Sequence, residues 1–247
     1  MKAIQHFSGS TGNLYEIVAN NGKRLLLEVG VPWSKLKWAI NYDLSNIEAA
    51  FASHFHSDHF KAHKDVMMSG IDLYASKEAF ESSGSENNRR AKILTDKTLV
   101  RLDSFQVYCF GVEHDCPNTF GFIVRENETG EYLFFATDTA FIKLLFTYPF
   151  SIIMIECSYD KDIVQGNVED DSISESLAKR LLDTHMELST TIDYLGKCNL
   201  QECREIHLIH CSATNLDIRK AKMRVQKQLF VDVITRYDEL EQKEGVA

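Results

Sequence analysis

The chain contains 247 residues, of which 44% are hydrophobic and 26% are charged, and its formal net charge at pH 7 is −9. This composition excludes a disordered or fibrous protein, and no apolar run approaches the ~20 residues of a membrane span. The acidic balance disfavours an extended nucleic acid as substrate, because nucleic-acid-binding proteins usually present a basic face to the phosphates. We expect one layered α/β domain over residues 1–247.

The N-terminal segment and the cysteines indicate a reducing compartment. Residues 1–10 (MKAIQHFSGS) lack the apolar stretch of an export signal, so we expect a cytoplasmic protein without a membrane anchor. The six cysteines are scattered without a C-x-x-C pair, which favours buried free thiols over disulfides or a thiolate zinc site.

The first half of the chain predicts a β-meander that leads into a histidine-rich loop. Short apolar runs alternate with turns, and Asn20-Asn21-Gly22 is a hairpin signal. The strand predicted over 47–53 ends where the histidines begin, so these side chains sit on a loop. Strands are predicted over 3–6, 14–18, 24–29, 47–53 and 72–75, helices over 33–40, 60–68 and 77–82, and an exposed loop over 83–90.

The second half repeats the order of strands followed by helices. Residues 159–172 are acidic and show no periodicity, which predicts a mobile loop that acts as a lid. Two strand-rich halves, each closed by helices, predict an αββα sandwich of the α/β class. Strands are predicted over 99–102, 105–111, 121–125, 132–136, 151–155, 205–209 and 231–234, and helices over 174–182, 188–195 and 217–228.

Residues 54–59 (HFHSDH) carry three histidines and one aspartate within six positions. Imidazole and carboxylate groups bind zinc and related divalent ions, and two such sets can hold two metals about 3.5–4 Å apart that jointly activate water. Three further candidate ligands, His114, Asp138 and His210, each follow an apolar run that predicts a strand. Ligands at strand ends point into one shared cleft.

The pattern H-x-H-x-D-H, followed by spaced His, Asp and His, resembles the metallo-β-lactamase superfamily over nearly the whole chain. Segments 8–13 (SGSTGN), 114–115 (HD), 136–139 (ATDT) and 208–212 (LIHCS) are similar to the branch that contains RNase Z and the YycJ-like phosphodiesterases. The resemblance implies a four-layer αββα metallo-β-lactamase sandwich. It also implies that His54, His56 and His114 hold one metal ion, that Asp58, His59 and His210 hold the second, and that Asp138 bridges the two.

The resemblance further implies a proton-delivery pair, and Asp58 joins this pair as a catalytic residue. Glu156 follows an apolar strand and His185 opens a later helix, as in that branch. An alkoxide that leaves phosphorus needs an acid, and a histidine oriented by a carboxylate supplies a proton near neutral pH. Glu28 stands where the family has an aspartate that supports loop geometry.

These features favour a phosphodiesterase with two divalent ions, zinc in the first place and manganese as the alternative. No segment is long and basic enough to be the arm by which RNase Z proteins grip transfer RNA. The segments LLLEVG (25–30) and HMELSTT (185–191) resemble the phage-encoded anti-Pycsar enzymes, which open cyclic mononucleotides. The resemblance implies a small cyclic nucleotide as substrate, a homodimer, and action in the cytoplasm of the host if the protein is phage-encoded.

Three alternatives stay open. A YycJ-like exonuclease would act on DNA ends with the same metals. A thioesterase or lactonase would act on a carbonyl carbon, but its leaving group needs less acid help than the Glu156 and His185 pair provides. A non-catalytic binding protein on a decayed scaffold is disfavoured, because every ligand position is filled.

Overall fold

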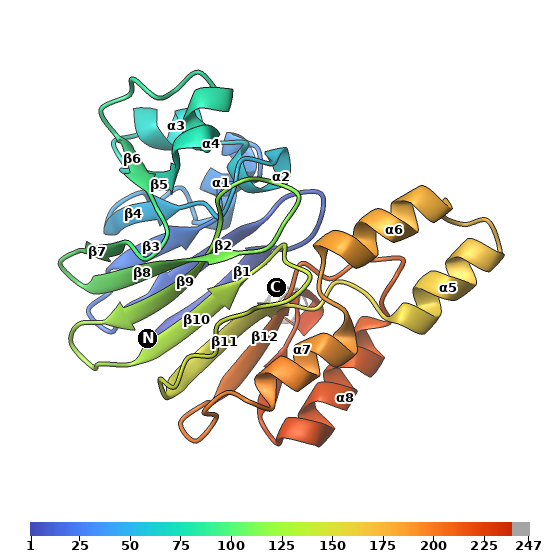
Figure 1. Cartoon of the computed structure of the whole chain (residues 1–247). Helices are drawn as coiled ribbons and strands as arrows, with labels where there is room; N and C mark the ends of the chain where they lie inside the picture. The colour runs from blue at the N-terminus through green and yellow to red at the C-terminus, as the bar shows by residue number, and fades with distance from the viewer. Residues whose placement is uncertain (239–247) are drawn as a thin grey trace. The chain divides into compact units, whose positions relative to one another are not determined.

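The computed structural model describes residues 1–238, which include the strands β1 to β13 and the helices α1 to α8; Figure 1 shows how these elements follow one another along the chain. Unit 1 comprises residues 1–111 and 116–131, and unit 2 comprises residues 112–115 and, within the described chain, residues 132–238. A six-stranded sheet, a seven-stranded sheet and the helices confirm the predicted α/β fold class; the single domain stays a prediction. No helix in the described part of the chain is long and apolar enough to cross a membrane.

Unit 1 contains the whole six-stranded sheet, in the order β1-β2-β3-β4-β5-β6. The first three strands pair antiparallel, and β3 to β6 pair parallel. The carboxyl ends of β3, β4 and β5 therefore lie along one edge, and the loops that follow them are neighbours. The strands are β1 (Lys2–Phe7), β2 (Leu14–Val18), β3 (Arg24–Leu27), β4 (Ile47–Phe51), β5 (Leu73–Ser76) and β6 (Ala91–Leu94), followed along the chain by β7 (Leu99–Arg101), β8 (Phe105–Val112) and β9 (Thr119–Glu126).

Four helices of unit 1 contribute apolar residues to a shared core. Leu36, Phe60, Val66 and Phe80 come one from each helix, and they form one buried cluster with Leu26 of β3. Burying a side chain of this size stabilises the fold by roughly 1.5–3 kcal/mol. The helices are α1 (Trp33–Ala39), α2 (Ser57–Phe60), α3 (His63–Met68) and α4 (Lys77–Ser82).

The single helix predicted over 60–68 is wrong. Helix α2 ends at Phe60 and α3 starts at His63, and between them the amide of Ala62 donates to the carbonyl of Val29 at 2.8 Å. A tertiary hydrogen bond of this kind leaves no trace in the apolar periodicity. The sequence also does not predict β6, which forms by parallel pairing with β5.

Unit 2 contains four parallel strands in the order β13-β12-β11-β10. Every residue of β11 is buried, as expected in a parallel sheet that is covered on both faces. Because the strands run in one direction, the loops after β10, β11 and β12 leave the same edge. The strands are β10 (Tyr132–Ala136), β11 (Phe150–Glu156), β12 (Glu205–Ile209) and β13 (Asp232–Ile234), and the helices are α5 (Lys161–Glu169), α6 (Glu175–Thr184), α7 (Leu188–Leu195) and α8 (Ile218–Leu229).

The mobile lid predicted over 159–172 is wrong, because most of this segment forms helix α5 (Figure 1). The Asp160 side chain caps the helix by accepting a hydrogen bond from an amide of its first turn. Val164 is buried in a small cluster with Ala178 of α6, and this cluster packs the two helices together. Sparse apolar residues hide the helical period in the sequence, so the segment resembles a loop.

Gly30 allows a close approach between the loop after β3 and helix α2. A Cβ atom at Gly30 would lie 1.6 Å from the carbonyl oxygen of Asp58, which is backbone and cannot rotate away. We expect Gly30→Ala to lower the free energy of unfolding by about 3 kcal/mol or more, because it overpacks a fixed contact. Urea unfolding measures the effect. Gly166→Ala is the matched control, since a Cβ there meets nothing within 4 Å; equal stability of the two variants would contradict the clash.

Candidate metal centre

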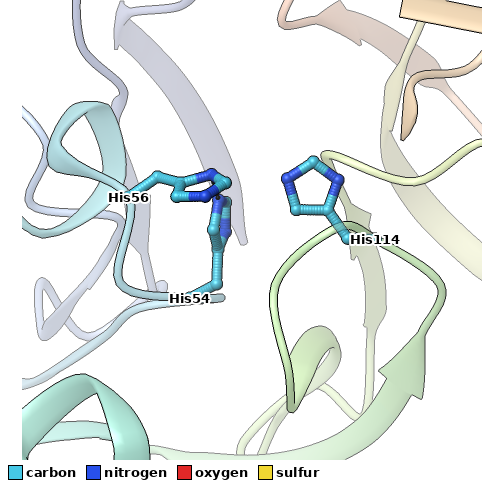
Figure 2. A group of neighbouring side chains, drawn as sticks. All are labelled: His54, His56 and His114. Atoms are coloured by element: carbon cyan, nitrogen blue, oxygen red, sulfur yellow. Dashed lines mark hydrogen bonds between the residues drawn. The ribbon is translucent and has the colours of Figure 1, made fainter. Parts of the chain in front are cut away.

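The loop after β4 in unit 1 carries His54 and His56. Nε2 of His54 lies 2.9 Å from Nδ1 of His56, and the rings meet edge to face with their centroids 4.6 Å apart (Figure 2). Oγ of Ser53 lies 2.8 Å from Nδ1 of the buried His54, which leaves Nε2 as the nitrogen that faces His56. Two nitrogens on one tetrahedral zinc ion are about 3.3 Å apart at the usual Zn–N distance, so this pair fits a shared ion.

Helix α2 places Asp58 and His59 in its first turn. Nε2 of His59 lies 3.4 Å from an oxygen of Asp58 and 3.1 Å from Nδ2 of Asn13. Its Nδ1 lies 3.3 Å from a carboxylate oxygen of Glu28. Because the Nδ2 group of Asn13 can only donate, Nε2 of His59 accepts from it and is unprotonated, which is the form that binds a metal. The surroundings of His59 therefore favour the tautomer of a metal ligand.

Glu28 contacts a candidate metal ligand, whereas the family resemblance implies only that this position supports loop geometry. Its fully buried carboxylate contacts His59 and also accepts the amide of Ser53 at 3.2 Å. Its backbone has φ +65°, a region that residues with a side chain rarely adopt. The contacts of Glu28 and Asn13 with His59 do not follow from their spacing in the sequence; for Asn13 the family-like SGSTGN segment is the available sequence signal.

Unit 2 brings four side chains together at the carboxyl edge of its parallel strands. One donor atom from each lies within 4.8 Å of the others. The four residues are Asp138 after β10, Glu156 at the end of β11, His185 after α6 and His210 after β12. Asp138 has φ +49° and His210 has φ +50°, and such left-handed backbone in residues with a side chain concentrates at functional sites.

Glu156 is the centre of this group and is fully buried. One carboxylate oxygen lies 2.6 Å from Nδ1 of His185 and 3.4 Å from Nδ1 of His210. The other accepts the amide of Thr139 at 2.8 Å. Both imidazoles thus turn Nδ1 toward Glu156, and Nε2 of His210 lies 3.7 Å from Asp138. A carboxylate that orients histidines in this way is typical of metal sites.

Burial and charge act in opposite directions on Glu156 and His185. Burial alone would raise the pKa of Glu156 and lower the pKa of His185. Their hydrogen-bonded ion pair outweighs burial, so the pKa of Glu156 lies below its usual value and the pKa of His185 lies above it. His185 is thus held protonated to higher pH and is oriented through Nδ1. Its role as an acid stays a prediction.

His114, labelled in Figure 2, belongs to unit 2, and its ring contacts other residues of that unit. Its Nδ1 donates to the carbonyl of Thr184 at 3.1 Å, so Nε2 carries the lone pair. That atom lies 3.8 Å from Asp138 and 3.1 Å from Asp115. Burial lowers the pKa of His114, so the ring is neutral at pH 7, as a metal ligand must be.

The candidate donors are imidazole nitrogens and carboxylate oxygens rather than thiolates. All six cysteines are free, as predicted. Burial raises the pKa of Cys211, the neighbour of His210, to about 12, so its thiol stays protonated. Nitrogen and oxygen donors suit zinc, manganese and similar divalent ions. The residues present in each unit therefore fit the metal ions that the sequence predicts.

The family comparison assigns the chain to a known class. The family model described as the β-lactamase superfamily domain matches residues 31–210. The chain belongs to this superfamily, and its described histidines and acidic residues form groups that could hold metal ions. No curated protein matches it by sequence.

Solved structures share the fold at low sequence identity. The metallo-β-lactamase fold protein YhfI from Bacillus subtilis has a TM-score of 0.71 and 12% identity, with 94% of this chain and 95% of that chain covered. A diphosphatase of the PhnP family has a TM-score of 0.63 and 13% identity, with 94% and 93% covered. The short form of human tRNase Z has a TM-score of 0.61 and 16% identity, with 95% and 96% covered.

Removing the charge of Glu28 tests whether this residue supports a metal ligand. We expect metal-free wild-type protein to take up two zinc ions per chain, and Glu28→Gln to weaken one of them by about 10–100-fold, because His59 loses its carboxylate partner. Titration against a chelator measures both affinities. Glu48→Gln, at the amino end of β4, is the control. Saturation at one ion per chain would contradict the pair of ions, and unchanged affinity in Glu28→Gln would contradict its role.

Proposed function

We propose that this protein is a two-metal phosphodiesterase that opens the 3′,5′ phosphodiester of a small cyclic nucleotide. The observation that carries the proposal is the hydrogen bond between the buried Glu156 and the partly buried His185, beside Asp138 and His210. A hydrolase that expels an alkoxide needs an oriented acid next to its metal ligands. The homodimer and the cytoplasmic location stay predictions.

The proposed metal ions are held by the ligand sets expected from the sequence. Family membership and the donor chemistry of each unit support this assignment. Two bound divalent ions polarise a phosphoryl oxygen and supply a nucleophile at neutral pH. His54, His56 and His114 would hold one ion, Asp58, His59 and His210 would hold the other, and Asp138 would serve both, with zinc as the first candidate.

The protein's own contribution to bond cleavage is proton delivery. Glu156 accepts from Nδ1 of His185, so Nε2 is the nitrogen that would give a proton to the departing oxygen. The raised pKa of His185 increases its protonated fraction at neutral pH, although burial opposes this. The thioesterase and lactonase alternatives explain this arrangement less well, because a thiolate leaves without such help.

The acidic chain favours a small phosphodiester over a long polyanion. A net charge of −9 repels an extended nucleic acid at range, whereas a mononucleotide with one negative charge is held locally by two dications. The similar structures include a diphosphatase and a tRNase Z, which supports phosphorus rather than carbon as the reacting centre.

The aromatic and lysine side chains on helix α1 favour an exonuclease as the second candidate function. It contains both tryptophans of the chain, and Trp38 is 57% exposed. Nζ of Lys37 lies 5.6 Å from the ring centroid of Trp33, and Lys35 lies 6.0 Å from that of Phe7. Trp33 and Phe7 pack against the core, so Trp38 is the exposed ring of this group; an exposed aromatic ring beside lysines is typical of surfaces that stack single-stranded bases.

The two candidates are separated by comparing substrates under the same metal and salt. We expect kcat/KM to be highest for cyclic mononucleotides among a panel with cyclic dinucleotides, single-stranded DNA and a generic phosphodiester. Trp38→Ala should leave kcat/KM for cyclic mononucleotides unchanged, since a small ligand does not need to stack a further base on the exposed Trp38 ring. Efficient cleavage of DNA ends with no cleavage of cyclic nucleotides at high enzyme would replace the leading proposal with the exonuclease.

His185→Ala and Glu156→Gln test the acid. Both should lower kcat by ~10²-fold or more on an alkyl phosphodiester, the usual scale for a lost general acid, while metal content stays intact. The loss should shrink on a nitrophenyl phosphodiester, whose leaving group needs no proton. Elemental analysis accompanies the kinetics, because loss of a metal in His185→Ala would show that His185 is a ligand instead.

A further inference from the structure

Helix α6 holds the His114 loop at two points. The carbonyl of Thr184, its last residue, accepts from Nδ1 of His114. One turn earlier, Nε and Nη2 of Arg180 each lie 3.1 Å from Oδ2 of Asp115. The other oxygen of Asp115 lies 3.1 Å from Nε2 of His114. One carboxylate group therefore separates the Arg180 guanidinium from the nitrogen that faces Asp138.

This ion pair adds little to the stability of the fold. The side chains of Arg180 and Asp115 are 62% and 32% exposed, and exposed pairs contribute about 0–1 kcal/mol. The pair instead fixes the direction of the Arg180 guanidinium. This group has five N–H donors, and Asp115 engages two of them. The remaining donors belong to a group that is mostly open to solvent beside His114.

We propose that Arg180 binds the anionic phosphodiester group of the substrate and that Asp115 positions it for this task. The inference rests on the proposed function. A planar guanidinium matches phosphoryl oxygens with paired hydrogen bonds, which an ammonium group does not. Arg180 would favour an ester that keeps a negative charge on phosphorus, because an uncharged ester would gain no ionic attraction from the guanidinium.

Arg180→Met tests the contact with kinetics and with binding. We expect KM for a phosphodiester to rise about tenfold or more, the scale of a lost hydrogen bond to a charged group, while kcat and zinc content change little. Calorimetry with inorganic phosphate and the zinc-loaded protein should show the same loss of affinity. Arg180→Lys should recover only part of it.

Two variants control for charge and for loop geometry. Lys179→Met removes the same charge from the next, exposed position of α6. Lys143→Met removes the partner of Glu113 on the other side of His114. The proposal would be overturned if Arg180→Met and these controls had the same KM and the same phosphate affinity. Weaker zinc binding in Arg180→Met would also overturn it, because Arg180 would then act on His114 rather than on the substrate. A wild-type protein inactive on every phosphodiester would defeat the proposed function, while the phosphate calorimetry would still decide for or against Arg180.

Discussion

The chemistry of unit 2 depends on one buried carboxylate. Glu156 has no exposure to solvent, and an uncompensated charge in such a place costs several kcal/mol. Its oxygens are compensated by His185, His210 and the amide of Thr139. The same contacts that keep the charge in the core also fix both imidazole rings. Stability and positioning therefore come from the same contacts, which are the hydrogen bonds to His185 and Thr139 and the 3.4 Å ion-pair contact with His210.

Unit 1 uses the same arrangement independently. Glu28 directly follows β3, and Glu156 is the last residue of β11. Both side chains are fully buried. The Glu28 carboxylate contacts His59 and accepts the amide of Ser53. In both units a glutamate at the carboxyl end of a parallel strand turns Nδ1 of a histidine inward and leaves Nε2 for another partner. The left-handed backbone at Glu28 is the local cost of bringing the carboxylate to that place.

Helix α6 contacts the His114 loop at two points in unit 2. Its last residue, Thr184, supplies the carbonyl that accepts from His114, Arg180 one turn earlier pairs with Asp115, and His185 follows the helix directly. The small cluster that packs α5 on α6 is separate from the cluster described in unit 1.

The sequence by itself determined the family and the strand ends after which the candidate ligand residues lie; the ligand assignment itself stays a prediction. Strand periodicity is local, so β12 was predicted with its observed bounds and His210 was placed just beyond it. Only the tertiary structure decided that Ala62 bonds to Val29 and breaks a helix, that residues 161–169 form α5, and that Glu28 meets His59. These depend on contacts between residues far apart in the chain, and such contacts leave no periodic signal along it.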